Sequence, residues 1–255
     1  MIPLHLLVLL AGLGVRFILN IRLYDKIPNA MFGLLIAGYI LIMTIVPFVT
    51  VFALCWRFYK NLFTDEGYLT LTLPVTPNQH LLSKLISGII WMLFDYAALI
   101  LCIVLPVTIP DILAQSDQIL AEMDEVLEMS SVTFFTLMFV IGLVSCVVNT
   151  LFYYVCIAIG QLFSKHRVIA AVIMYFAIST VLSTLNSAAL LIAGFFPSAG
   201  GFPFFAIGSE NLNTGYAAAP IIIKSCWFGI ICMVIQGIAS YAGTLYIMKK
   251  KINLE

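Results

Sequence analysis

Charge is scarce in this chain. Of its 255 residues, 12 are Lys or Arg and 12 are Asp or Glu, so charged side chains make up 9% of the sequence and the formal net charge is zero. A soluble domain is about one quarter charged and about half apolar, whereas 63% of these residues are hydrophobic. This composition excludes a soluble domain and predicts a polytopic membrane protein, with the lipid bilayer around it and no nucleic-acid partner.

Motifs of catalysis and metal binding are also absent from the sequence. It contains no Gly-x-x-x-x-Gly-Lys-Ser/Thr, no His-Glu-x-x-His and no Gly-x-Ser-x-Gly, so we expect neither an ATPase nor a hydrolase site in this chain. Its six cysteines lie within apolar runs and form no Cys-x-x-Cys. His5, His80 and His166 are far apart and have no carboxylate or Cys companion at ligand spacing. We therefore expect no catalytic residue, no metal and no cofactor in this chain.

Most of the sequence consists of long apolar runs. A membrane span needs about 20 apolar residues, and the first run has neither the basic leader nor the small-residue cleavage signal of a signal peptide. We interpret it as a retained span. The chain is thus predicted to be one all-α integral membrane domain, residues 1–255, with six spans at about 2–20, 30–56, 82–109, 131–163, 168–196 and 219–247.

Basic residues gather on one side of these predicted spans. Because Lys and Arg favour cytoplasmic loops, we assign that side to the cytoplasm, which places both termini there in a multi-pass plasma-membrane protein. Eight of the twelve basic residues lie on this side: Arg57, Lys60, Lys84, Lys165, Arg167, Lys249, Lys250 and Lys251.

Two outer loops have distinctive sequences. Residues 111–131, "DILAQSDQILAEMDEVLEMSS", predict an amphipathic helix outside the membrane, because apolar residues recur every seven positions with six acids between them. We favour a solvated cap over an acidic pathway exit. Residues 195–220, rich in Phe, Gly and Pro, predict a re-entrant segment buried against protein, with an aromatic interfacial belt as the alternative.

Asp95 is the only acid deep within a predicted span. An acid at that depth must face protein or water, and such residues mark functional sites by default. One interpretation is a substrate-pathway or coupling group. The other is a structural hydrogen bond to a polar side chain such as Asn149 or Asn186, and the sequence favours neither.

The fifth predicted span has a polar stripe. Ser179, Ser183 and Ser187 follow one another every four residues beside Thr180, Thr184 and Asn186. Such a stripe is typical of helix–helix packing with hydrogen bonds between helices. Lining of a translocation route is the second interpretation.

The predicted cytoplasmic loop, residues 57–81, has two helix-start signals. Thr76, Pro77 and Gln79 predict a capping box that opens the third span. Thr64, followed by two acids, predicts another helix start. Leucines then alternate with other residues, as in a strand, but a lone strand would have no sheet to join. We therefore predict a short surface helix over residues 64–72, whose apolar groups need a partner.

This loop resembles the permease subunits of type-two ATP-binding cassette exporters. The residues that carry the resemblance are Asp65-Glu66-Gly67-Tyr68-Leu69-Thr70-Leu71, Pro74-Val75-Thr76 and Leu81-Leu82-Ser83-Lys84-Leu85. The six spans and the predicted re-entrant segment extend it over most of the chain, and the loop is most similar to that of small permeases from Gram-positive bacteria. The sequence departs from the family at Thr70, where a Glu is usual, and in starting without the usual amphipathic helix.

The resemblance implies a function and two protein partners. A coupling helix at residues 64–72 would dock on a separate ATPase subunit that holds ATP and Mg²⁺, through Thr64, Asp65, Glu66, Gly67, Tyr68, Leu69 and Leu71. A second permease subunit, identical or different, would complete the pathway. The expected activity is export of an amphipathic substrate, a peptide or antimicrobial. The alternatives are a proton- or ion-coupled transporter that uses Asp95, and a membrane sensor or immunity factor for which no loop argues specifically.

Overall fold

The structure is a computed structural model that describes residues 2–21, 28–64, 74–163, 166–192 and 218–250. Within these ranges it contains α-helices and no strands, and six of the helices are long and apolar enough to cross a membrane. The predicted all-helical, six-span fold is therefore confirmed. The predicted coupling helix and re-entrant segment fall mostly on residues 65–73 and 193–217, outside the described residues.

The six spanning helices differ in length. Helices α2 and α4 have 35 and 31 residues, and at 1.5 Å per residue they extend for about 52 and 46 Å. A bilayer core is only about 30 Å thick, so both helices continue beyond it. The spanning helices are α1 (Ile2–Asn20), α2 (Asn29–Phe63), α4 (Pro77–Val107), α6 (Ser131–Gly160), α7 (Arg167–Ile192) and α8 (Ala218–Lys250).

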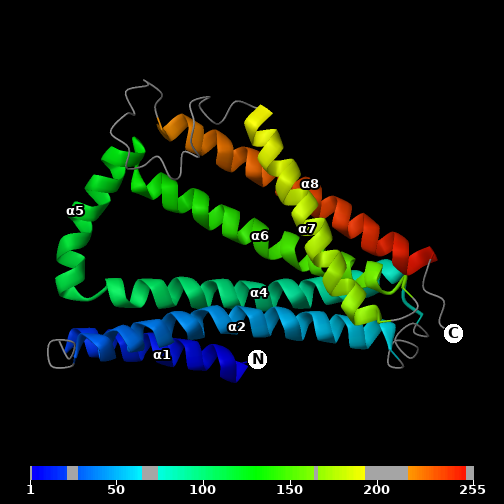
Figure 1. Ribbon diagram of the computed structural model, residues 1–255, viewed down its shortest axis with the longest axis horizontal. Helices are drawn as coiled ribbons and strands as arrows, with labels where there is room; N and C mark the ends of the chain where they lie inside the picture. Colours follow the sequence, from blue (N-terminus) through cyan, green and yellow to red (C-terminus); the bar gives the residue numbers. More distant parts are fainter. Residues whose placement is uncertain (1, 22–27, 65–73, 164–165, 193–217, 251–255) are drawn as a thin grey trace.

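Helices α2 and α4 lie side by side along the length of the molecule, and the shorter α1 covers one half of them (Figure 1). Helix α6 meets α4 near the end where α4 begins, and diverges from it toward the other end. Helices α7 and α8 pack against α6. The bundle is therefore tight at one end and spread at the other.

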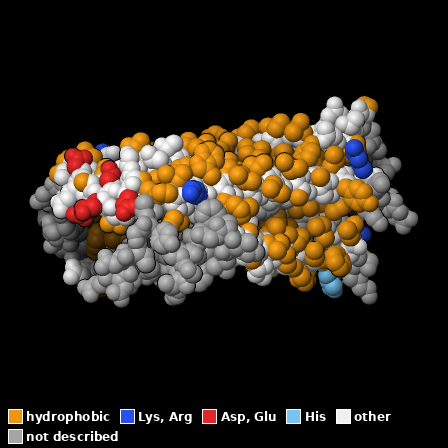
Figure 2. Space-filling view, turned by 90° about the horizontal axis from the view of Figure 1, so that it is seen from above, with side chains coloured by type: hydrophobic (Ala, Val, Ile, Leu, Met, Phe, Trp, Pro, Cys, Tyr) orange, Lys and Arg blue, Asp and Glu red, His pale blue; other side chains and the backbone are white. Residues whose placement is uncertain are grey.

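Helix α5 (Pro110–Leu127) is the remaining helix of the described ranges, outside the six spans. It connects α4 to α6 at the end where these two helices diverge (Figure 1). It is the amphipathic helix expected after the third span. Pro110 occupies its first turn, where a missing N–H costs nothing. The Asp124 carboxylate accepts a hydrogen bond from the Ser131 N–H at 2.5 Å, which caps the start of α6. Figure 2 shows acidic side chains gathered at this end, beside a broad apolar band along the molecule.

The tight end of the bundle contains the largest buried cluster among the described residues. It draws side chains from α2, α4, α6 and α8: Phe58, Leu62, Leu81, Leu85, Leu151, Tyr154, Ile157 and Met248. Lys60, Lys84, Arg167 and Lys249 lie on the turns of helix that end or begin here. We call this the basic end, and the α5 end the acidic end.

Candidate functional site

Three polar side chains from three helices meet inside the apolar part of the bundle: His5 from α1, Thr50 from α2 and Asp95 from α4. Their exposed fractions are 9%, 0% and 4%. Asp95 lies on the buried face of α4, seven residues after Gly88 and seven before Cys102, and these two residues are also buried. Residues seven positions apart lie on the same face of an α-helix, so the Asp95 carboxyl group points into the bundle together with Gly88 and Cys102.

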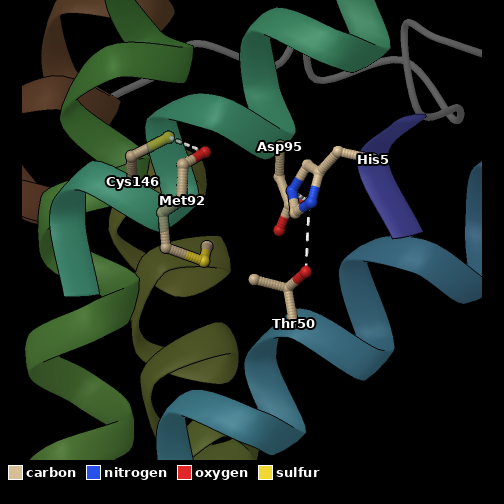
Figure 3. A network of polar contacts seen from close by, with 5 residues as sticks. All are labelled: His5, Thr50, Met92, Asp95 and Cys146. Carbon is tan, nitrogen blue, oxygen red and sulfur yellow. Dashed lines mark hydrogen bonds and ion pairs between the residues drawn. The ribbon is translucent and has the colours of Figure 1, made fainter. Parts of the chain in front are cut away.

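Both neighbours approach the same oxygen of Asp95. His5 Nε2 lies 2.7 Å from Asp95 Oδ1, and the Thr50 hydroxyl donates a hydrogen bond to that oxygen at 3.2 Å (Figure 3). Trp91, one turn before Asp95, places its ring 5.8 Å from the His5 ring. The imidazole is thus held between an aromatic ring and a carboxyl group.

Asp95 Oδ2 has no hydrogen-bond partner among the described residues. Beside it, the Cys146 thiol of α6 donates to the Met92 carbonyl oxygen at 3.7 Å, a long contact that joins α6 to the same stretch of α4 (Figure 3). A carboxyl group in this setting is tolerated when it is paired or protonated. The cluster can therefore hold a proton between His5 and Asp95, or join three helices through polar contacts.

The side chains that contact Asp95 are not Asn149 or Asn186, which the sequence suggested as hydrogen-bond partners. Asn149 is half-buried on α6 and Asn186 is exposed on α7, and neither hydrogen-bonds Asp95 in the part of the chain that is described. His5 was missed because its carboxyl partner is 90 positions away in the sequence. The sequence did contain a signal for this contact, because His5 and Asp95 are each an isolated polar residue within an apolar run.

The polar stripe of α7 does not form cross-helix hydrogen bonds within the described chain. The hydroxyl groups of Ser179 and Thr180 donate to the Phe176 carbonyl oxygen of their own helix, at 3.0 and 2.8 Å. Ser183 and Asn186 are exposed. The stripe is therefore available to another chain or to a pathway, and both predicted roles stay open.

The capping box at the start of α4 is confirmed. The Thr76 hydroxyl accepts from the Gln79 N–H at 3.4 Å, and the Gln79 side chain accepts from the Thr76 N–H at 2.9 Å. Thr64 follows the end of α2, where its hydroxyl donates to the Lys60 carbonyl oxygen at 2.6 Å. The other predicted coupling residues, Asp65, Glu66, Gly67, Tyr68, Leu69 and Leu71, lie outside the described residues.

Fold and site together define a six-span α-helical membrane protein with a polar cluster buried among its first three spans. No family model, curated protein or solved structure matches the chain. Within the described ranges, no group of three or more His, Cys, Asp and Glu side chains is placed to hold a metal ion.

Proposed function

We propose that this chain is the membrane-spanning permease subunit of an ATP-binding cassette exporter, driven by a separate ATPase subunit that binds ATP and Mg²⁺. The observation that carries the proposal is the position of the two helix ends that flank the cassette-permease pattern, the end of α2 and the start of α4. Helix α2 ends at Phe63 and α4 begins at Pro77 at the basic end, and both helices contribute side chains to the largest buried cluster among the described residues. The helices on either side of the cassette-permease pattern are thus joined to each other through this buried cluster.

Packing at the basic end suits the transmission of force. Close-packed interiors transmit strain because they contain few voids that could absorb it. A push on the segment would therefore move the ends of α2, α4, α6 and α8 together, since all four contribute to the same cluster. The opposite ends of α4 and α6 diverge and are bridged by α5 (Figure 1). A rigid driven end and a spread far end fit an alternating pathway.

The expected partners follow from the same arrangement. The exposed Ser183 and Asn186 of α7 support a second permease subunit, identical or different, because small and polar residues favour close helix association in lipid. Basic residues at the driven end favour a cytoplasmic position for it and for both termini, in the plasma membrane. The substrate class, an amphipathic peptide or antimicrobial, rests on the loop resemblance.

Copurification tests the proposal. The tagged full chain is co-expressed with a cassette ATPase encoded in the same genome, and Glu66→Ala and Tyr68→Ala are compared with Glu125→Ala, which removes an exposed acid at the other end. We expect a stoichiometric complex that the first two variants weaken and the third retains. A chain that purifies alone and transports without ATP contradicts the proposal.

The second candidate function is proton- or ion-coupled transport, and the His5–Asp95–Thr50 cluster favours it. A carboxyl group 2.7 Å from an imidazole can exchange a proton with it. Flux of substrate that follows the pH gradient without ATP, and that stops in Asp95→Asn, is the expected result. Flux that persists in Asp95→Asn rules this candidate out.

A further inference from the structure

An apolar groove of about 500 Å³ lies between α2, α6 and α7. Aromatic rings form much of its wall: Phe48, Phe52, Trp56 and Tyr59 from α2, Tyr153 from α6 and Tyr175 from α7. Several of these side chains are uncovered by the chain itself. Phe48, Phe52 and Trp56 are 71%, 70% and 51% exposed and follow one another every four residues along one face of α2.

The groove has a closed side and a defined length. A Cβ atom added at Gly160 would lie 2.8 Å from the backbone of Ala171, so α6 and α7 touch there and close one wall. From Pro47 to Tyr59 the groove-lining residues of α2 extend for about 18 Å at 1.5 Å per residue. That length is close to half of a bilayer's ~30 Å hydrocarbon core, so the groove is long enough to take an acyl chain of one leaflet.

Two cationic side chains lie just beyond the groove, toward the basic end, on the same helix faces that line it. Lys60 lies one helical turn beyond Trp56 on α2, and Arg167 lies one turn before Ala171 on α7. Both are exposed. The sequences of α2, α6 and α7 contain no Asp or Glu. Helix α4, which adds Met92 to the lining, contains Asp95, and that carboxyl group contacts His5 and Thr50. Gln161, which also lines the groove, adds a carboxamide near the same end.

We propose that this groove binds an acyl chain of an anionic phospholipid from the leaflet at the basic end, with the headgroup held by Lys60 and Arg167. Aromatic walls suit a hydrocarbon chain, and the two exposed cations favour a negative headgroup, since basic residues at a membrane surface attract anionic lipid. The site lies within one chain. It does not require that the chain transports anything, so it stands apart from the proposed exporter function.

Tryptophan fluorescence provides a matched test. The chain has three tryptophans, and Trp56 in the groove and Trp227 on α8 are equally exposed, at 51% and 53%. Two single-tryptophan proteins are made, one retaining Trp56 and one retaining Trp227. Each is reconstituted with phosphatidylglycerol or phosphatidylcholine that has brominated acyl chains, which quench indole on contact. We expect Trp56 to prefer phosphatidylglycerol about five- to tenfold, and Trp227, one helical turn from the exposed cation Lys224, to show a smaller ratio.

Substitutions then separate the groove from general surface charge. Lys60→Gln with Arg167→Gln lowers the Trp56 preference to about one, whereas Lys224→Gln, an exposed cation on α8, leaves it unchanged. Val172→Phe fills the groove and keeps both cations, and it also abolishes the preference. The proposal is overturned if both lipids quench Trp56 equally, if the preference survives Val172→Phe, or if neither lipid reaches Trp56 because another protein chain covers the groove.

Discussion

Phe58 of α2 and Tyr154 of α6 stack face to face at the basic end, with ring centroids 3.9 Å apart and ring planes 5° apart. The Tyr154 hydroxyl donates to the Lys84 carbonyl oxygen of α4 at 3.1 Å. One aromatic pair thus joins three helices at the basic end. Contact of this kind matters in lipid, where helix association depends on packing and hydrogen bonds more than on the hydrophobic effect.

Truncation of this pair is expected to destabilise the bundle. Phe58 is 1% exposed, so Phe58→Ala should lower the free energy of unfolding by about 3–5 kcal/mol through lost contacts and a residual cavity. Phe17→Ala, at a side chain that is 64% exposed on α1, should change it by less than about 0.5 kcal/mol. Unfolding by dodecyl sulfate in mixed micelles measures both. Equal effects would mean that the basic end is not the stable part of the fold.

A glycine in the same region sets the distance between α4 and α6. A Cβ atom added at Gly88 would lie 2.7 Å from Thr150 Cγ2 and from the Tyr154 hydroxyl oxygen. Gly88→Ala should therefore destabilise the protein by about 1–3 kcal/mol through overpacking. At Gly229 nothing lies within 4 Å of an added Cβ, so Gly229→Ala should be neutral or stabilising by up to about 1 kcal/mol. The same denaturation experiment compares the two, and a harmless Gly88→Ala would contradict the close approach.

The helix start at Thr76 gives a third prediction. Thr76→Ala should cost about 1 kcal/mol, because it removes the side chain that accepts the Gln79 N–H at the start of α4. Thr76→Ser keeps the hydroxyl and should retain most of the stability. Hydrogen exchange of the first-turn amides should accelerate in the alanine variant alone. Equal protection in both variants would show that the cap is dispensable.

Local patterns made part of this structure predictable from the sequence. The capping box joins residues three positions apart, and the helix α5 follows from a seven-residue repeat, so neighbouring residues contain all the information needed. The spans follow from apolar runs of sufficient length. Each of these features is fixed by contacts or by a period within one segment of chain.

Contacts between distant segments could not be obtained in the same way. His5 is 90 positions from Asp95, and Phe58 is 96 positions from Tyr154. Which faces of apolar helices meet depends on small differences in packing, and the sequence of one helix does not specify its neighbour. The cost of a carboxyl group in lipid predicted that Asp95 faces protein or water, but it could not choose between a pathway group and a structural hydrogen bond, and it could not identify His5. The coupling role of residues 64–72 stays a prediction.

The His5–Asp95 pair gives the last prediction, a double-mutant cycle. His5→Leu alone leaves a buried carboxyl group with only the Thr50 donor, and it should cost about 3–5 kcal/mol. Asp95→Leu alone leaves a buried imidazole without its acceptor. The double variant replaces both polar groups by apolar ones and should be more stable than the two single effects predict, with a coupling energy of about 1–3 kcal/mol.

A second cycle controls for general effects of removing polar groups. His80 is also buried on α4, but it precedes Asp95 by 15 residues, about 22 Å along the helix. His80→Leu combined with Asp95→Leu should therefore be additive within about 0.5 kcal/mol, because the two sites share no partner. Coupling in the first cycle alone identifies a direct interaction. If the first cycle is additive too, then His5 and Asp95 act independently, and a proton shared between them is no longer a basis for the ion-coupled alternative.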